Sequence, residues 1–489
     1  MLKSQSRFVV KDRRVATGGC VKPSGKSAFV FWSCVMTSKN RRMATRITYV
    51  LLLLLVLCFI PAYAQENLHV WPNAVSSRNS DPWLVKHHDH ITEMRPRVLF
   101  INFGNGIDVY GTANNDNIDW GPVTPEILKQ KVAAYIHVME VATTYQPALN
   151  KSSRPFISPR VKLVDLSDKS GHANSLLLPR RVNSSGVLAF DYTALFGDGY
   201  KQYWHIRNAA GKALNLGEAF AAGLLNEVLV CANGVDPSPG TPADQSVQMN
   251  ETMSAYERYD ANFKKIPGSL INWPSEFGLP YRGASIRIQS LNLSRDIEFE
   301  FPQGGPAPGN FYGYDLHGLS HEVEYRAGWY FDFIPYFTTY FRRYADFDMA
   351  SKYNVSINSL YEGGDGYTYS DLLPNGAFNS ITLPNRQIVI DNYRPVAGNV
   401  HYPPGAAFGY DYMPNATVMS SMESFAKHHQ RAVPFNSQKW QYLFNDPQIA
   451  GDNGNHWLVY WWQNMPGYEN YSLDDSGRRM KNWFVFLYY

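Results

Sequence analysis

Two histidines and a glutamate lie at helical spacing in the middle of the chain, where the segment 317–324 has the sequence HGLSHEVE. On a helix, positions i, i+4 and i+7 share one face, so His317, His321 and Glu324 would converge. Two imidazoles and a carboxylate form a ligand set for a divalent ion such as zinc, with one position open for water. The segment therefore predicts a metal site or an acid–base pair, and the alternative is a helix whose histidines bond to nearby backbone or carboxylate groups.

A second histidine-bearing segment, with the sequence GNVHYPP, lies at 398–404. The Pro-Pro pair holds His401 on a rigid turn, and functional groups often lie on fixed loops of this kind. We expect His401 to complete a catalytic site with His321 and Glu324. The alternative is a histidine that only packs within its loop.

Other segments carry possible ligands, and each has a plainer interpretation. The sequence HHDH at 87–90 could bind a metal loosely or form an exposed polar patch. The sequence NDNID at 115–119 alternates oxygen ligands like a calcium loop, but Trp120 occupies the place of the required glycine. The glycine-rich segment 362–366 indicates turns. Spacing does not reveal the paired carboxylates of glycoside hydrolysis, for which the eligible residues are Glu324, Asp332, Asp411 and Glu423.

Several common chemistries are absent from the sequence, which contains no Gly-x-Ser-x-Gly elbow, no Walker A loop and no Cys-x-x-Cys pair. Aromatic residues make up 15% of the chain. Those late in the sequence have two possible roles. They either lie exposed, where they would stack on sugar rings, or form an aromatic core. The late tryptophans are Trp457, Trp461, Trp462 and Trp483.

The elements that must position these residues begin with a largely apolar run at 97–103, typical of a buried parallel strand. A helix should follow, with Thr124 as its N-cap and Pro125 at its first position. A second strand is expected at 161–166. Strand, helix and strand at this spacing predict a βαβ unit with a right-handed crossover.

Later segments extend this pattern. A helix is expected at 214–225 and strands at 227–230 and 284–293, although the dinucleotide-binding fingerprint is absent. We therefore predict an α/β fold with a Rossmann-like layered sheet in residues 95–300. Residues 301–489 should form a helical, loop-rich and aromatic part packed on the same core, within one large domain. Its helices should break at Gly328 and Pro335, and its portion from about 350 onward should consist of long ordered loops.

The beginning of the chain resembles a secretory leader. Three arginines precede the apolar run 49–60, which is followed by small residues up to Ala64. The run is short for a membrane span of about 20 residues. We expect a signal peptide at 43–64 cleaved near Ala64, a lead segment at 65–94, and a secreted protein that is extracellular or periplasmic. If synthesis starts at Met43, the basic extension 1–42 is not translated. Otherwise it forms a long n-region or a signal anchor.

Removal of residues 1–64 would change the charge and the cysteine content together. The mature chain would keep 34 of 45 basic and 41 of 42 acidic residues, which excludes nucleic acid as a partner. It would also keep Cys231 alone of four cysteines, and the apolar run before it favours a buried thiol over a catalytic one. Seven Asn-x-Ser/Thr sequons would accept glycans in a eukaryotic secretory pathway.

Parts of the chain resemble a family of secreted, mostly bacterial proteins of unknown function. The resemblance covers most of 95–489 and rests on the segments 97–103, 316–324, 398–412, 461–462 and 482–483. In that family a Gly-His-x-x-Glu stretch corresponds to His321 and Glu324, with Ser320 in place of the glycine, and a Gly-Asn-Val-His stretch corresponds to 398–401. Cysteines of that family near 397 and 422 are absent here. The resemblance implies the architecture and the candidate sites, and it brings no established activity.

These observations predict a secreted hydrolase, dependent on a divalent metal, that acts on an extracellular glycan or peptide. His321, Glu324 and His401 would serve in catalysis, and His317, His321 and Glu324 would bind the metal. The alternative is a non-catalytic extracellular protein that binds glycans through aromatic loops. No membrane span is expected in the mature chain.

Overall fold

The structure is a computed structural model, and it describes residues 69–489 with internal gaps. The described ranges are 69–73, 81–105, 124–145, 154–168, 174–233, 247–292, 316–329, 332–356, 367–383, 386–425, 431–446, 448–449 and 453–489. The chain divides into two units, 1–65 and 66–489, and every described residue belongs to the second. The predicted extension 1–42 and signal peptide 43–64 lie outside the described residues.

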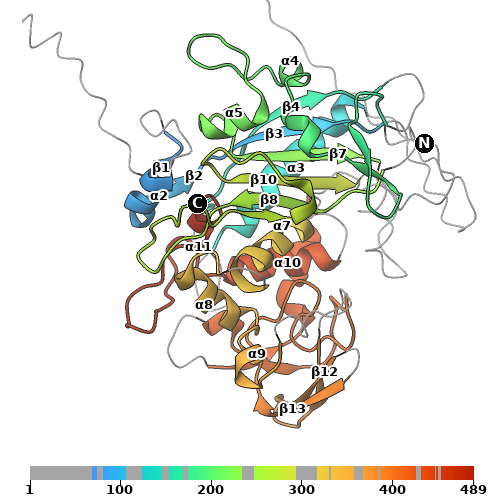
Figure 1. Cartoon of the computed structure of the whole chain (residues 1–489). Coiled ribbons are helices and arrows are strands. Elements are labelled where there is room, and N and C mark those ends of the chain that lie inside the picture. Colours follow the sequence, from blue (N-terminus) through green and yellow to red (C-terminus); the bar gives the residue numbers. More distant parts are fainter. Residues whose placement is uncertain are drawn as a thin grey trace, which may run out of the picture. The chain divides into compact units, whose positions relative to one another are not determined.

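A six-stranded mixed sheet carries the fold of residues 66–489 (Figure 1). Its strand order is β4-β3-β7-β10-β8-β9. The strands are β3 (Arg97–Asn102), β4 (Arg160–Asp165), β7 (Glu227–Ala232), β8 (Thr252–Tyr256), β9 (Ile271–Trp273) and β10 (Ile286–Asn292). The first four strands in this order are parallel, whereas β8 runs antiparallel to both β10 and β9. The fold is therefore α/β, as predicted, but its sheet is mixed.

The predicted βαβ unit is confirmed. Strand β3 leads through helix α3 (Pro125–Ala142) into β4, and the two strands pair in parallel along their whole length. The Thr124 side chain accepts a hydrogen bond from the backbone N–H of Ile127, and Pro125 occupies the first helical turn. The strands expected at 227 and 284 and a shorter helix α5 (Leu216–Ala221) are also present.

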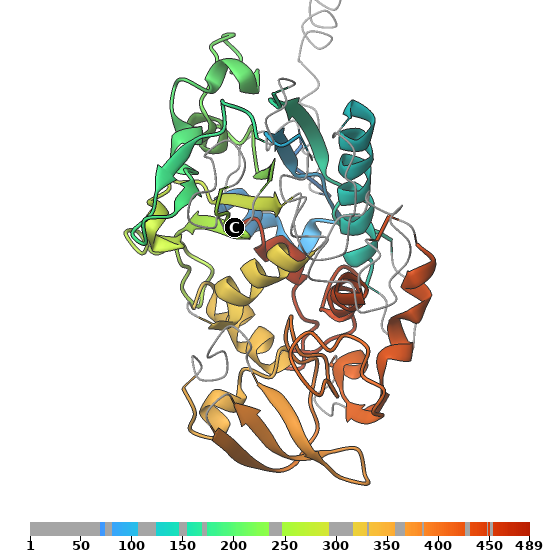
Figure 2. The ribbon, with the colours of Figure 1, turned by 90° about the vertical axis from the view of Figure 1, so that its right-hand side faces the viewer.

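Each face of the sheet packs against its own apolar core, because successive strand residues point to opposite faces. Phe100 and Leu229 face a core shared with α3, α7 (His317–Glu324) and α10 (Asn453–Asn464). Leu99 and Val228 face the opposite core, which is built from the segment 178–225. That segment contains β5 (Arg180–Val182), β6 (Leu188–Phe190), η2 (Thr193–Phe196), α4 (Lys201–Trp204) and α5. Figure 2 shows α3 and α10 on one side of the sheet and the green segment on the other.

The predicted break in the aromatic helical segment is confirmed. Helix α7 continues into a π-helical turn (Tyr325–Trp329), and α8 (Pro335–Tyr344) starts with Pro335 in its first turn. A β-carbon on Gly328 would lie 2.7 Å from the Phe347 ring, so the turn needs glycine there. A short helix, α9 (Met349–Lys352), follows.

The prediction of long loops from about residue 350 onward is wrong, because this part contains regular elements. Its strands are β11 (Thr368–Leu372), β12 (Phe378–Leu383), β13 (Arg386–Tyr393), β14 (Val418–Ser420) and β15 (Val433–Phe435). The first three form an antiparallel sheet and the last two form a hairpin. Strand β13 buries only two of its eight residues, so it lacks the alternation that reveals a half-buried strand. The helices of this part are η6 (Met422–Ser424), η7 (Ser437–Asn445), α10 and α11 (Trp483–Phe486).

The late tryptophans form a core. Trp457, Trp461 and Trp462 on α10 have no exposed surface, and Trp483 on α11 is 1% exposed. The indole N–H of Trp462 donates to the Ser320 hydroxyl at 2.8 Å, which ties α10 to α7. Residues 454–464 of α10 are all buried, the polar ones included. The interpretation of these four tryptophans as sugar-stacking residues is therefore wrong.

Four described elements precede the six-stranded sheet in the sequence: β1 (Val70–Trp71), α2 (Asp81–His87), η1 (His88–His90) and β2 (Glu93–Met94). A further short helix, η3 (Ser275–Phe277), follows β9. The Cys231 side chain on β7 is buried, as predicted. No helix within the described ranges combines the length and apolar character that crossing a membrane requires.

Candidate metal centre

Three histidine rings meet beside the first two turns of α7. His317 and His321 lie one helical turn apart, and His401 comes from the loop at 398–402. The Nε2 atom of His401 lies 3.0 Å from Nε2 of His317 and 2.9 Å from Nε2 of His321. In the described part of the chain, this is the group whose ligand atoms all lie within 4.8 Å of one another as a metal would require.

Hydrogen bonds alone do not account for the close approach of these three ring nitrogens. A neutral imidazole nitrogen offers either one proton or one lone pair. Nε2 of His401 can therefore hydrogen-bond to only one of the two nitrogens that it meets at hydrogen-bonding distance. Three lone pairs aimed at one cation remove the conflict. Tetrahedral zinc with Zn–N bonds of 2.0–2.1 Å separates its ligand nitrogens by about 3.3 Å, close to the two distances from His401, and all three ligand atoms lie within 4.8 Å of one another.

Glu324 lies behind His321 and joins the two segments that supply the rings. Its Oε2 lies 3.0 Å from Nδ1 of His321, and its Oε1 accepts the backbone N–H of Val400 at 2.9 Å. The carboxylate is completely buried. A carboxylate on Nδ1 fixes the tautomer that leaves Nε2 with its lone pair, which is the usual second contact of a metal-bound histidine.

All four residues predicted for the site thus come together, in an arrangement that the helical spacing did not show. The spacing grouped His317, His321 and Glu324 as ligands, and the Pro-Pro turn suggested His401 as a residue that completes the site. In the structure His401 brings its ring nitrogen to the two helical histidines, while Glu324 contacts the opposite edge of one ring.

Sequence reasoning missed a second carboxylate, Glu251, which precedes β8. Its Oε1 lies 3.7 Å from Nδ1 of His317, and its side chain is 37% exposed. Gly318 permits this approach, since a β-carbon there would lie 3.2 Å from the Glu251 carbonyl oxygen. Nothing in the sequence around 251 indicated this role. Two of the three histidines therefore have a carboxylate near the nitrogen that faces away from the cluster.

The loop that carries His401 is held by Asp346, another residue that sequence reasoning missed. The buried Asp346 carboxylate accepts the backbone N–H groups of Val396 and Gly398 at 2.9 Å each. It also accepts the hydroxyls of Tyr369 and Tyr393 at 2.6 Å each. Burial raises the pKa of Asp346, and these hydrogen bonds act in the opposite direction. The loop is thus built around one buried acid.

The turn itself depends on Gly398 and Asn399. Gly398 has a φ of 66°, and a β-carbon there would collide with the Tyr402 carbonyl oxygen. The Asn399 side chain accepts the backbone N–H groups of His401 at 2.9 Å and Tyr402 at 3.1 Å. Glycine supplies the left-handed backbone and asparagine closes the turn, so the position of His401 is set locally.

Among the described residues, the centre is most exposed around His317, which we call its open side. The side chains of His321 and Glu324 are 4% and 0% exposed, whereas that of His317 is 13% exposed. Tyr410 lies next to the open side, with its ring centroid 4.3 Å from that of His401 and 6.2 Å from that of His317. A ligand would therefore approach past His317, Glu251 and Tyr410.

The other carboxylates considered from the sequence are engaged elsewhere. Asp332 pairs with Arg342 at 3.3 Å, and Asp411 accepts the backbone N–H of Ala407. Glu423 pairs with Lys439 at 3.0 Å. The segments 115–119 and 362–366 lie outside the described residues.

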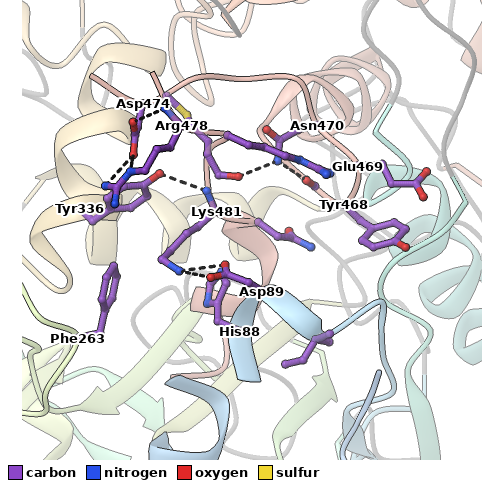
Figure 3. Close-up of a pocket in the computed structure, with 15 residues that line it drawn as sticks. His88, Asp89, Phe263, Tyr336, Tyr468, Glu469, Asn470, Asp474, Arg478 and Lys481 are labelled. Carbon is purple, nitrogen blue, oxygen red and sulfur yellow. Dashed lines mark hydrogen bonds and ion pairs between the residues drawn. The ribbon is translucent and has the colours of Figure 1, made fainter. Parts of the chain in front are cut away.

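A hollow of about 400 Å³ is lined by His88, Asp89 and the segment 467–482 (Figure 3). Its central charges pair with each other, Lys481 with Asp89 at 2.7 Å and Arg478 with Asp474 at 3.1 Å. His88 is buried, and burial lowers its pKa to about 3, so its ring is neutral. Within the described residues the histidines at 87–90 form no converging ligand set. The three-histidine group is therefore the stronger candidate.

No family model, no curated protein and no solved structure matches this chain. The resemblance to secreted proteins of unknown function stays a prediction, and the site must be interpreted from its own geometry.

Proposed function

We propose that this protein is a metal-dependent hydrolase in which His317, His321 and His401 bind a divalent ion, with zinc as the best fit. The observation that carries the proposal is the convergence of three Nε2 atoms, with Glu324 on the far nitrogen of His321. Three neutral nitrogen ligands and an open position are a common set for catalytic zinc. A bound ion of this kind supplies a Lewis acid that lowers the pKa of its water.

The residues of the chain divide the remaining work. Glu324 holds the proton on Nδ1 of His321 and keeps Nε2 available, while Glu251, 3.7 Å from Nδ1 of His317, adds a negative charge on the open side. The burial of His321 and Glu324 keeps bulk water from the inner face of the centre. The substrate would be an extracellular glycan or peptide, reached after secretion through the leader ending near Ala64.

The location in the fold supports a functional role. Glu251 precedes β8, which runs antiparallel to β10, so it lies at the edge where the parallel strands end. In α/β sheets ligands bind outside the carboxyl ends of the strands. A Rossmann-like arrangement of the layers is part of this proposal, within the observed α/β class.

The second candidate function is a non-catalytic glycan-binding protein of the cell exterior. It loses its first support because the four late tryptophans are buried. Its remaining support comes from exposed aromatic residues such as Tyr410 and Phe408, which are 45% and 64% exposed. Activity separates the two candidates.

The test is hydrolysis by the purified chain with and without a chelator, on panels of glycan, peptide and ester substrates. We expect activity that disappears with chelation, returns with zinc, and falls at least about 100-fold in His321→Ala. The exposed His69 serves as the control, and His69→Ala should act like the wild type. Activity that survives both chelation and His321→Ala would overturn the metal-dependent mechanism.

A further inference from the structure

Tyr410 has an unusual backbone for an aromatic residue. Its φ of 62° lies in the left-handed region, which is unfavourable for a residue with a β-carbon. The residue is 45% exposed, so burial offsets only part of that strain. Strained residues that the surrounding structure maintains cluster at binding and catalytic sites.

The surrounding turn holds Tyr410 in place. The backbone N–H of Tyr410 donates to the His401 carbonyl oxygen at 3.0 Å, and the Asp411 carboxylate accepts the backbone N–H of Ala407 at 2.9 Å. Gly409 lies against Tyr402, whose hydroxyl oxygen would be 2.8 Å from a β-carbon at that position. These contacts place the Tyr410 ring beside the histidine rings while part of it stays exposed to solvent.

We propose that Tyr410 is a sugar-binding platform beside the histidine centre, so that the substrate class is a glycan. The inference rests on the proposed function for its catalytic meaning, but the binding itself is independent of a metal. A sugar ring combines a flat C–H face, which packs on an aromatic ring, with hydroxyl groups around its edge. Glu251, on the same open side of His317, offers an exposed acceptor for such hydroxyls.

A glycan fits this surface better than an apolar peptide side chain does. Pockets for apolar groups enclose most of the ligand surface. Tyr410 presents a half-exposed ring, and Phe408 in the same turn is 64% exposed. Two exposed aromatic residues in one turn suit a chain of several sugar units, so an oligosaccharide should bind more tightly than a monosaccharide.

The test measures binding of neutral hexasaccharides of glucose and of N-acetylglucosamine to the full protein, by calorimetry and saturation-transfer NMR. Tyr410→Asn removes the ring but keeps a residue that tolerates the left-handed backbone. We expect the Kd of Tyr410→Asn for the hexasaccharides to rise about tenfold or more. The Kd of Tyr410→Phe should stay within about threefold of the wild-type value. A tenfold change corresponds to about 1.4 kcal/mol. Tyr471→Asn is the matched control, because Tyr471 is 51% exposed in a different segment.

Two results would overturn the proposal: wild-type affinity in Tyr410→Asn, or no binding of either hexasaccharide. Zinc content is measured on every variant, so that the two proposals can fail separately. Sugar binding through Tyr410 in a protein that takes up no zinc would leave the platform and remove the metal centre. Zinc binding without sugar binding would leave the metal centre and remove the platform.

Discussion

At the scale of single residues, the centre is defined by which nitrogen each histidine presents. The Nε2 atoms of His317, His321 and His401 face one another, while a carboxylate lies near Nδ1 of two of the rings. Glu324 matters most, because one carboxylate orients His321 and also receives the backbone N–H of Val400 from the loop that carries His401. Metal binding should therefore depend on a residue that need not contact the metal.

Replacing Glu324 by glutamine tests this role with little change in volume. The amide can still accept the Val400 N–H, but its NH2 group would then face Nδ1 of His321 and favour the tautomer with a protonated Nε2. We expect zinc affinity to fall about 10- to 100-fold, the usual effect of losing such a partner. Competition with a chromophoric chelator measures it, and Glu126→Gln at an exposed position of α3 is the control. Unchanged affinity in Glu324→Gln would show that His321 does not need this carboxylate.

At the scale of elements, the centre joins a helix to a loop 80 residues further along the chain. Helix α7 sets the spacing of two rings, and the turn at 398–402 sets the third through Gly398, Asn399 and the buried Asp346. The precision of the site therefore depends on a backbone turn as much as on the ligands.

Alanine at Gly398 should damage this turn. The left-handed backbone alone costs about 1 kcal/mol, and the collision of the new β-carbon with the Tyr402 carbonyl adds to it. We expect Gly398→Ala to lower the free energy of unfolding by about 2–4 kcal/mol and to weaken zinc binding. Gly211→Ala is the matched control, because Gly211 also has a positive φ but has open space around it. Equal losses in the two variants, measured by urea unfolding, would contradict the packing argument.

Some elements could be predicted from the sequence and others could not, for physical reasons. The strand at 97–102 is a nearly continuous apolar run because both its faces are buried, and Pro125 identifies the start of α3. Strand β8 has the sequence TMSAY and is buried throughout, so its composition does not show its burial. His401 is expected beside His321 because its Pro-Pro turn marks a fixed loop, but the approach of Glu251 to His317 is a long-range contact that local spacing does not encode.

At the scale of the whole molecule, residues 66–489 combine an aromatic core with buried charges. Trp461 is completely buried and packs edge-to-face on Phe341 at 5.8 Å. Glu227 is buried at the amino end of β7, where Arg287 lies 3.5 Å from its carboxylate. These features govern stability, and the three-histidine group lies on the scaffold that they maintain.

Trp461→Ala should destabilise the protein without a direct effect on sugar binding. Removal of a large buried aromatic side chain costs about 3–5 kcal/mol. Phe408→Ala, at a 64% exposed position, should stay within about 0.5 kcal/mol of the wild type. Denaturant unfolding measures both variants. A Trp461 variant of wild-type stability would be incompatible with the aromatic core.

Glu227 should make the stability depend on pH. Burial raises its pKa from 4.5 to about 7, against the opposing effect of Arg287. Between about pH 4.5 and 7 the native state then holds a proton that the unfolded state has lost, so the free energy of unfolding falls as the pH rises. A glutamine at this position cannot titrate. The free energy of unfolding of Glu227→Gln should therefore fall less steeply with pH than that of the wild type, with a difference in slope of up to about 1.4 kcal/mol per pH unit. Parallel pH profiles of the two proteins, from urea unfolding, would refute this assignment.

Metal binding by the three histidines is tested most directly by the zinc content of the purified chain, measured by mass spectrometry after gentle purification and again after reconstitution. We expect close to one zinc per chain in the wild type and in His69→Ala, and a loss of at least about tenfold in zinc affinity in His401→Ala. It is His401 that brings the third nitrogen to the two on α7. Less than about 0.2 equivalents in the reconstituted wild type, or equal zinc in His401→Ala, would contradict metal binding by these histidines.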